Sequence, residues 1–138
     1  MRKLFGIAIG CILLCGLVMA AMLAVPPPTN NLIIINCAVQ TGGVDIPWFV
    51  LSKKGKDTVQ WTNGCGLPCK VSFGPQSPFV EEPIDVGADA TSKQYDAINA
   101  PNPPKNWEKT KPNDVYIVYK YSIKCDGTTF DPGGGVKP

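Results

Sequence analysis

The chain has 138 residues, of which 13 are basic, 11 are acidic and none is histidine. Without Arg2 and Lys3, which open an apolar leader, 11 basic residues face 11 acidic ones, and a neutral domain lacks the field that attracts nucleic acid. The lack of histidine excludes Ser-His and Cys-His nucleophile activation, so we expect a protein that is not an enzyme.

Residues 1–24 form the first predicted element, because two basic residues precede an apolar run that ends in small residues. This pattern predicts a secretion signal, and cleavage after Ala20 is favoured over cleavage after Ala24. The run is also long enough to cross a bilayer, so an uncleaved N-terminal anchor stays open. With either outcome, the folded part lies outside the cytoplasm.

Residues 25–31 include three consecutive prolines and predict a stiff spacer. The remaining residues, 32–138, suffice for one domain but fall short of two. Short apolar or alternating runs bounded by turn residues predict its strands. These predicted strands cover residues 32–39, 46–51, 57–62, 69–73, 80–86, 92–98, 115–125 and 128–130.

Two of these runs, 57–62 and 69–73, alternate apolar and polar residues, which predicts half-buried antiparallel strands with odd-numbered residues on one face. Residues 100–113 predict a long loop, and Asp126-Gly127 predicts a tight hairpin. Three glycines at 133–135 weaken the last strand. Many short strands without a convincing amphipathic helix after the leader predict an all-β sandwich or barrel.

Four cysteines lie outside the leader: Cys37, Cys65, Cys69 and Cys125. An even number in an exported domain of this size predicts two disulfides, and the sequence alone leaves three pairings open. Two other interpretations remain. Cys65 and Cys69 match one half of a zinc module whose second half is absent, and the same two residues fit a redox-active pair.

Three sequence blocks together are typical of one family: KGKDTVQWTN at 54–63, PCKVSF at 68–73 and YKYSI at 119–123. With them, the chain resembles the cupredoxin-like family, the Greek-key β-sandwich of plastocyanin and its relatives, over residues 32–138. The resemblance implies the fold. It is strongest to the copper-free cupredoxin-like domains of exported bacterial proteins.

The resemblance also implies where the copper ligands of the family would fall. The first histidine falls on Cys69, the thiolate on Ile123 and the second histidine on Asp126, while the axial methionine has no counterpart. A type 1 copper site needs imidazole, thiolate and usually thioether ligands. We therefore expect no blue-copper site, no other metal site and no cofactor.

One disulfide pairing is favoured by the resemblance. Strand parity in this family turns Cys69 and Cys125 inward, at the end of the sandwich where the metal would have been. Pairing them leaves Cys37 to bridge Cys65 across the ends of the first and third strands, which run side by side in this fold. The alternative, Cys65 with Cys69 and Cys37 with Cys125, stays open.

The tryptophans are candidates for the core or for a binding surface. Trp61 has the inward parity of its strand and is predicted to be core. Trp48 and its neighbour Phe49 cannot both point inward, so one of them is exposed. Trp107 lies in the predicted loop, where it either marks a binding surface or pins the loop to the sandwich.

The sequence thus predicts an exported, non-catalytic domain, periplasmic or extracellular, that acts as a binding or structural module of the bacterial envelope. Its expected partner is another protein, a glycan or an envelope component, with membrane contact only through residues 1–24. Trp107 and Trp48 are the candidate binding residues. The alternatives are a metal-binding or electron-transfer protein with cysteine ligands and a thiol–disulfide redox protein.

Overall fold

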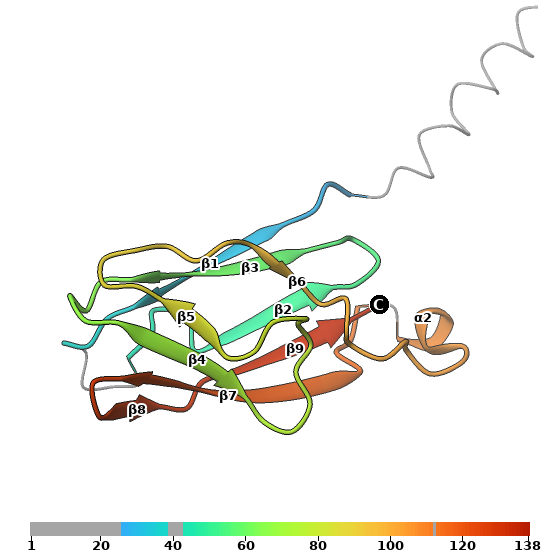
Figure 1. Cartoon of the computed structure of the whole chain (residues 1–138). Helices are drawn as coiled ribbons and strands as arrows, with labels where there is room; N and C mark the ends of the chain where they lie inside the picture. The colour runs from blue at the N-terminus through green and yellow to red at the C-terminus, as the bar shows by residue number, and fades with distance from the viewer. Residues whose placement is uncertain (1–25, 39–42, 112) are drawn as a thin grey trace, which may run out of the picture.

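Two facing β-sheets make up most of the computed structural model, which describes residues 26–38, 43–111 and 113–138 (Figure 1). The first sheet has the order β1-β3-β6, with β1 at Asn30–Ile35, β3 at Thr58–Asn63 and β6 at Tyr95–Asp96. The second sheet has the order β2-β9-β7-β4-β5, and β8 pairs with β7. Its strands are β2 (Trp48–Ser52), β4 (Cys69–Phe73), β5 (Ile84–Val86), β7 (Ile117–Cys125), β8 (Thr128–Phe130) and β9 (Gly133–Lys137). The predicted all-β class and the sandwich are confirmed.

The predicted signal or anchor, residues 1–24, lies outside the described residues. The region predicted as a long loop, 100–113, also contains the one-turn helix α2 (Trp107–Thr110), which the sequence did not predict. A backbone hydrogen bond from Lys111 N–H to Trp107 O, 2.8 Å, closes the turn, which is too short to leave a periodic signal in the sequence. No helix within the described ranges is long and apolar enough to cross a bilayer.

Strand alternation predicts the buried face correctly but not the strand direction. The odd-numbered residues of β3, namely Val59, Trp61 and Asn63, are buried. However, β3 pairs in parallel with β1 and antiparallel only with β6, so the antiparallel prediction is wrong for its main neighbour. Side chains alternate in both kinds of pairing, and the pattern therefore carries no information about direction.

The core lies between the two sheets and is organised around Trp61 of β3, which has no exposed surface. Its indole contacts five aromatic rings at centroid distances of 6.0–6.3 Å: Phe49, Phe73, Phe79, Tyr95 and Tyr121. Such pairs contribute about 0.5–1.5 kcal/mol each beyond their buried area. The predicted core position of Trp61 is confirmed, and this residue joins the two sheets.

The three glycines predicted to weaken the last strand lie in β9, which is an inner strand paired with both β2 and β7. A Cβ on Gly134 would lie 2.5 Å from the Phe49 ring inside the core. A Cβ on Gly133 would lie 2.8 Å from the Trp48 ring on the outer face. Glycine is therefore required at both positions so that one aromatic ring can pack against each face of β9.

Candidate functional sites: a cysteine cluster and a tryptophan groove

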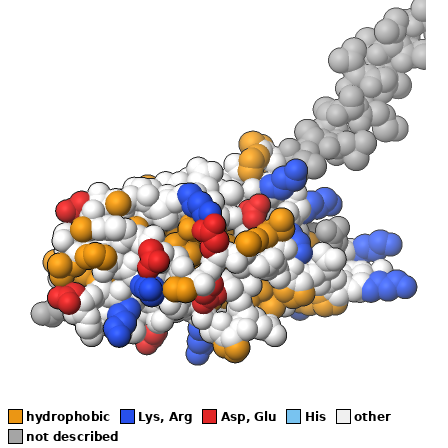
Figure 2. All heavy atoms as spheres, viewed as in Figure 1, with side chains coloured by type: hydrophobic (Ala, Val, Ile, Leu, Met, Phe, Trp, Pro, Cys, Tyr) orange, Lys and Arg blue, Asp and Glu red, His pale blue; other side chains and the backbone are white. Residues whose placement is uncertain are grey.

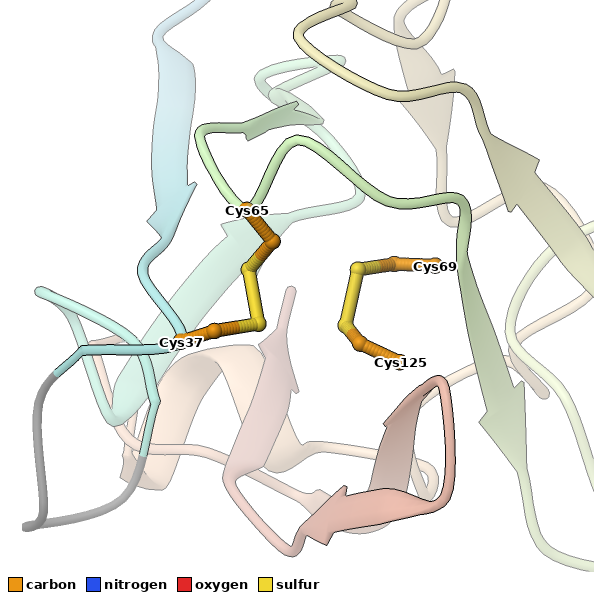
Figure 3. A group of neighbouring side chains, drawn as sticks. All are labelled: Cys37, Cys65, Cys69 and Cys125. Atoms are coloured by element: carbon orange, nitrogen blue, oxygen red, sulfur yellow. A yellow bond between two sulfur atoms is a disulfide. The ribbon is translucent and has the colours of Figure 1, made fainter.

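The four cysteines meet at one end of the sandwich and form two disulfides (Figure 3). Cys37 bonds Cys65 with a Cα–Cα distance of 5.2 Å, and Cys69 bonds Cys125 with a Cα–Cα distance of 4.3 Å. This confirms the pairing favoured by the resemblance, and the alternative with Cys65 bonded to Cys69 is wrong. Two disulfides indicate an oxidising environment.

Strand pairing explains why these partners meet. Cys69 and Cys125 are direct register partners on β4 and β7, and both side chains point inward. Cys37 follows β1 and Cys65 follows β3, two parallel neighbours that end on the same side. We call Cys69–Cys125 the inner bridge, because each residue is only 3% exposed, and Cys37–Cys65 the outer bridge, because Cys37 is exposed and Cys65 half-buried.

The two bridges form one cluster rather than two separate sites. Their four Sγ atoms all lie within 4.8 Å of one another, and Figure 3 shows the two S–S bonds side by side. Cys37 and Cys125 are too far apart in the sequence to form the second half of a zinc module. The fold nevertheless brings both of them next to Cys65 and Cys69. In this oxidised form every one of the four sulfurs is bonded to another sulfur, so none is available as a thiolate ligand.

Asn63 holds the loop that carries Cys65, although sequence reasoning gave it no role. It is 1% exposed, and its Nδ2 donates to the carbonyl oxygens of Leu67 at 2.7 Å and Gly87 at 2.9 Å. Its Oδ1 accepts a hydrogen bond from Cys65 N–H at 2.9 Å. One buried amide therefore fixes the β3–β4 loop against the second sheet. In the sequence, the only indication of this role is a polar residue at an inward-facing strand position.

The three positions onto which the resemblance maps copper ligands have separate roles. Cys69 belongs to the inner bridge, and Ile123 is a fully buried core residue. Asp126 is exposed and, with Gly127, forms the predicted two-residue hairpin turn between β7 and β8. Both residues have positive φ, 41° and 87°, as a type I′ turn requires.

An open groove of about 600 Å³ runs over the outer face of the second sheet, beside Trp48. We call it the tryptophan groove; its lining comes from Trp48, Ser72, Phe73, Gly74, Val118, Lys120, Tyr121, Ser122, Asp131, Pro132 and Gly133. Trp48 is 45% exposed and Val118 is 59% exposed, whereas Phe49 points into the core. The predicted split between Trp48 and Phe49 is therefore observed, with Trp48 outside.

Trp107 is half-buried and packs against Tyr116 and Lys111. Its ring meets the Tyr116 ring edge-to-face at 6.3 Å, and Lys111 Nζ lies 5.8 Å from its centroid. The Tyr116 hydroxyl donates to the Pro101 carbonyl oxygen, and burial raises the pKa of this phenol. This geometry fits a tryptophan that pins its segment to the sandwich better than one that marks a binding surface.

Lysines distant in the sequence gather at the end of the sandwich opposite the cysteines (Figure 2). We call this the lysine-rich end; it comprises Lys53, Lys54, Lys56, Lys105, Lys109 and Lys111. Lys53 Nζ links two of the segments by donating to Ala100 O and, at 3.2 Å, to Asn102 Oδ1. Lys53, Lys54 and Lys56 flank Gly55 in a turn, which by itself indicates only a solvated loop, so the sequence does not predict this cluster.

The start of β1 lies at the same end. Thr29 N–H donates to Asp57 Oδ1 at 2.8 Å, in the turn that follows Lys56. The segment leading back to residue 26 therefore leaves the domain beside the lysine-rich end, as Figure 1 also shows.

No family model matches the chain, and no curated protein matches it. Among solved structures, it is similar to the McoA multicopper oxidase from the hyperthermophile Aquifex aeolicus, with a TM-score of 0.40 and 10% sequence identity. The match covers 83% of this chain and 30% of the oxidase chain, so this chain spans less than a third of that protein.

Proposed function

We propose that this chain is an exported, non-catalytic cupredoxin-like domain that serves as a binding module of the bacterial cell envelope. The two disulfides suit an oxidising compartment, and the predicted leader suits export. The alternatives have less support. A cysteine-ligated metal or electron-transfer protein needs free thiolates, and a Cys65–Cys69 redox pair needs two residues that here belong to different bridges.

The tryptophan groove is the observation that carries the proposal. Trp48 keeps 45% of its surface exposed on the outer face of the sheet, and the glycines of β9 let its ring lie close against the strand. One face of the indole is thereby packed on backbone, while the side chain lines an open groove. This is a rigid aromatic surface with little conformational entropy left to lose on binding.

The chemistry of the lining favours a glycan. A sugar ring has an apolar face of C–H groups and a rim of hydroxyls, which suits an indole and an aliphatic side chain flanked by a few hydrogen-bonding groups. Trp48 and Val118 provide the apolar surface. Around them lie one cation, one anion and two hydroxyls: Lys120, Asp131, Ser72 and Ser122. The opposite charges balance, as expected for a neutral, hydroxyl-rich ligand.

Binding to envelope polysaccharide tests this function directly. The exported protein is sedimented with purified peptidoglycan, and soluble oligomers of N-acetylglucosamine are titrated by tryptophan fluorescence and calorimetry. We expect Trp48→Ala to weaken binding at least tenfold, as the loss of a tryptophan anchor would. The matched control is Trp107→Ala, which removes the half-buried indole of α2, away from the groove, and should leave binding unchanged.

Two results would overturn the glycan proposal. One is an absence of binding to both probes by wild-type protein, and the other is equal binding by wild-type protein and Trp48→Ala. Thermal unfolding of both variants checks that any loss comes from the groove rather than from the fold. If the glycan proposal fails in this way, the remaining candidate ligand for the groove is a protein.

The lysine-rich end supports a defined orientation at the envelope. The segment before β1 leaves the domain there, so a retained anchor would bring these lysines to the membrane surface. Each lysine near an anionic headgroup layer contributes about 1 kcal/mol. The tryptophan groove, which lies on the face of a sheet rather than at this end, would stay accessible.

Vesicle binding tests the orientation. The domain without its leader is mixed with phosphatidylglycerol vesicles at low salt, with pure phosphatidylcholine vesicles as reference. We expect the triple change K105Q/K109Q/K111Q to weaken binding at least tenfold, whereas the matched change K70Q/K120Q/K124Q on the second sheet has little effect. Equal weakening by both triple changes would mean that net charge, and not this end, determines the attraction.

A further inference from the structure

The most unusual chemical feature of the molecule is the contact between its two disulfides. All four Sγ atoms lie within 4.8 Å of one another, although only the two bonded pairs are needed to staple the fold. The inner bridge is 3% exposed at each residue, so a dissolved reductant has little access to it. The outer bridge is open to solvent through Cys37.

The backbone allows the outer pair more freedom than the inner pair. Cys69 and Cys125 sit within a ladder of β4 and β7, paired over five register positions. Cys65 instead lies between Gly64 and Gly66 in a loop, and a Cβ on Gly66 would have no heavy atom within 4 Å. The Cys65 Sγ already lies within 4.8 Å of both inner-bridge sulfurs, so once the outer bridge opens only a small movement of this side chain is needed to reach them.

We propose that the four cysteines form a thiol–disulfide relay, in which the outer bridge takes two electrons from an external dithiol and passes them to the inner bridge. The dithiol first reduces Cys37–Cys65 and is itself oxidised to a disulfide. The Cys65 thiolate then attacks Cys69 Sγ, so that a Cys65–Cys69 bond forms, the Cys69–Cys125 bond breaks, and Cys125 leaves as a thiolate that takes up a proton.

The second exchange restores the outer bridge. The Cys37 thiolate attacks Cys65 Sγ, the Cys37–Cys65 bond re-forms, and Cys69 leaves as a thiolate that is protonated. In total, two electrons and two protons move from the external dithiol to the inner pair, and no other oxidant or reductant is needed. The geometry thus points to a redox activity separate from the tryptophan groove, and it does not depend on the proposed glycan binding.

Two of the four cysteines also have hydrogen-bond acceptors for their thiols after reduction. Cys65 Sγ lies 3.9 Å from the Ile35 carbonyl oxygen, and Cys69 Sγ lies 3.7 Å from the Leu67 carbonyl oxygen. These carbonyls can accept S–H hydrogen bonds after reduction, so burial leaves neither thiol without an acceptor. Leu67 is 45% exposed beside Cys65, which leaves this side of the cluster open to an incoming dithiol.

A single substitution tests the central exchange. Cys37→Ser leaves Cys65 as a free thiol next to an intact inner bridge. After incubation at pH 8, acid quench, alkylation and peptide mapping, we expect the alkyl label on Cys65 and Cys125, together with a Cys65–Cys69 peptide. The same sample held at pH 5 should carry the label on Cys65 alone, because exchange requires the thiolate. Label confined to Cys65 at pH 8 would refute the relay.

Reduction kinetics give a second and independent test. Wild-type protein and the double variant C37S/C65S are treated with dithiothreitol, and loss of the Cys69–Cys125 bridge is followed by alkylation and mass spectrometry. We expect the inner bridge to be reduced at least tenfold more slowly in the double variant, because its entry point is gone. Loosening of the fold by the double change would act in the opposite direction, so slower reduction cannot arise from destabilisation. Equal or faster reduction would count against the relay.

Discussion

The two ends of the sandwich are held by different kinds of interaction. At the cysteine end, two disulfides and the buried amide of Asn63 hold the β3–β4 loop and the ends of the neighbouring strands, and the two-residue turn at Asp126-Gly127 joins β7 to β8. At the lysine-rich end, a one-turn helix and side-chain contacts such as Lys53 to Asn102 hold longer segments. The covalent cross-links are therefore concentrated at one end of the sandwich, while the opposite end is charged and solvated.

The largest expected difference between the ends comes from removing the inner bridge. C69S/C125S releases a loop with a sequence separation of 56 residues and should lower the free energy of unfolding by about 4 kcal/mol. Lys53→Met at the other end should cost less than about 1 kcal/mol, because it keeps an unbranched side chain of similar length and removes only the hydrogen bonds of Lys53 Nζ. Guanidinium unfolding of both variants measures the two effects. Similar costs at the two ends would contradict the comparison.

Asn63 gives the next largest effect. Asn63→Ala removes the donor to Leu67 O and Gly87 O and the acceptor for Cys65 N–H, so we expect a loss of about 3 kcal/mol. Asn102→Ala at the lysine-rich end is the matched control, and its expected cost is within about 0.5 kcal/mol. Urea unfolding checks both values. A cost for Asn63→Ala no greater than for Asn102→Ala would show that the loop is held in another way.

The smallest effect concerns alkaline pH. Burial raises the pKa of Tyr121 in the core far above its ordinary value, whereas the shift at Tyr116 comes from partial burial at the lysine-rich end. Because the folded pKa is raised, each phenol stabilises the fold fully below about pH 10 and loses that contribution as pH rises further. Tyr121→Phe should therefore flatten the decline of stability above about pH 10 by up to about 1.4 kcal/mol per pH unit.

Tyr116→Phe is the comparison for this pH effect, and it should flatten the decline less than Tyr121→Phe. Thermal unfolding between pH 8 and 11 measures both variants against the wild-type protein. An unchanged pH dependence in Tyr121→Phe would show that this phenol ionises as easily in the fold as in the unfolded chain.

Much of the fold could be predicted from local pattern. The strands at 69–73 and 128–130 match β4 and β8, because strict alternation and the Asp126-Gly127 signal set their limits. The inward position of Trp61 and the split between Trp48 and Phe49 follow from the same period of two. Parallel pairing of β1 with β3 and of β2 with β9 could not be read in this way, since it joins segments far apart in the chain.

The sites were less predictable, because they depend on contacts between distant segments. The tryptophan groove needs Gly133 to lie against Trp48, and consecutive glycines in a sequence indicate only a weak strand. The cysteine cluster needs four sulfurs from three separate regions, and the sequence spacing showed just one close pair. The lysine-rich end likewise combines two segments, each of which alone predicts a solvated loop.

Disulfide mapping of the exported protein is the most direct test of the closed cysteine end. Purified without reductant and alkylated before digestion, the protein should yield Cys37–Cys65 and Cys69–Cys125 peptides and no alkylated cysteine among these four. Its intact mass should show no bound metal. A dominant Cys65–Cys69 peptide, or four alkylated cysteines accompanied by a stoichiometric metal ion, would contradict the account.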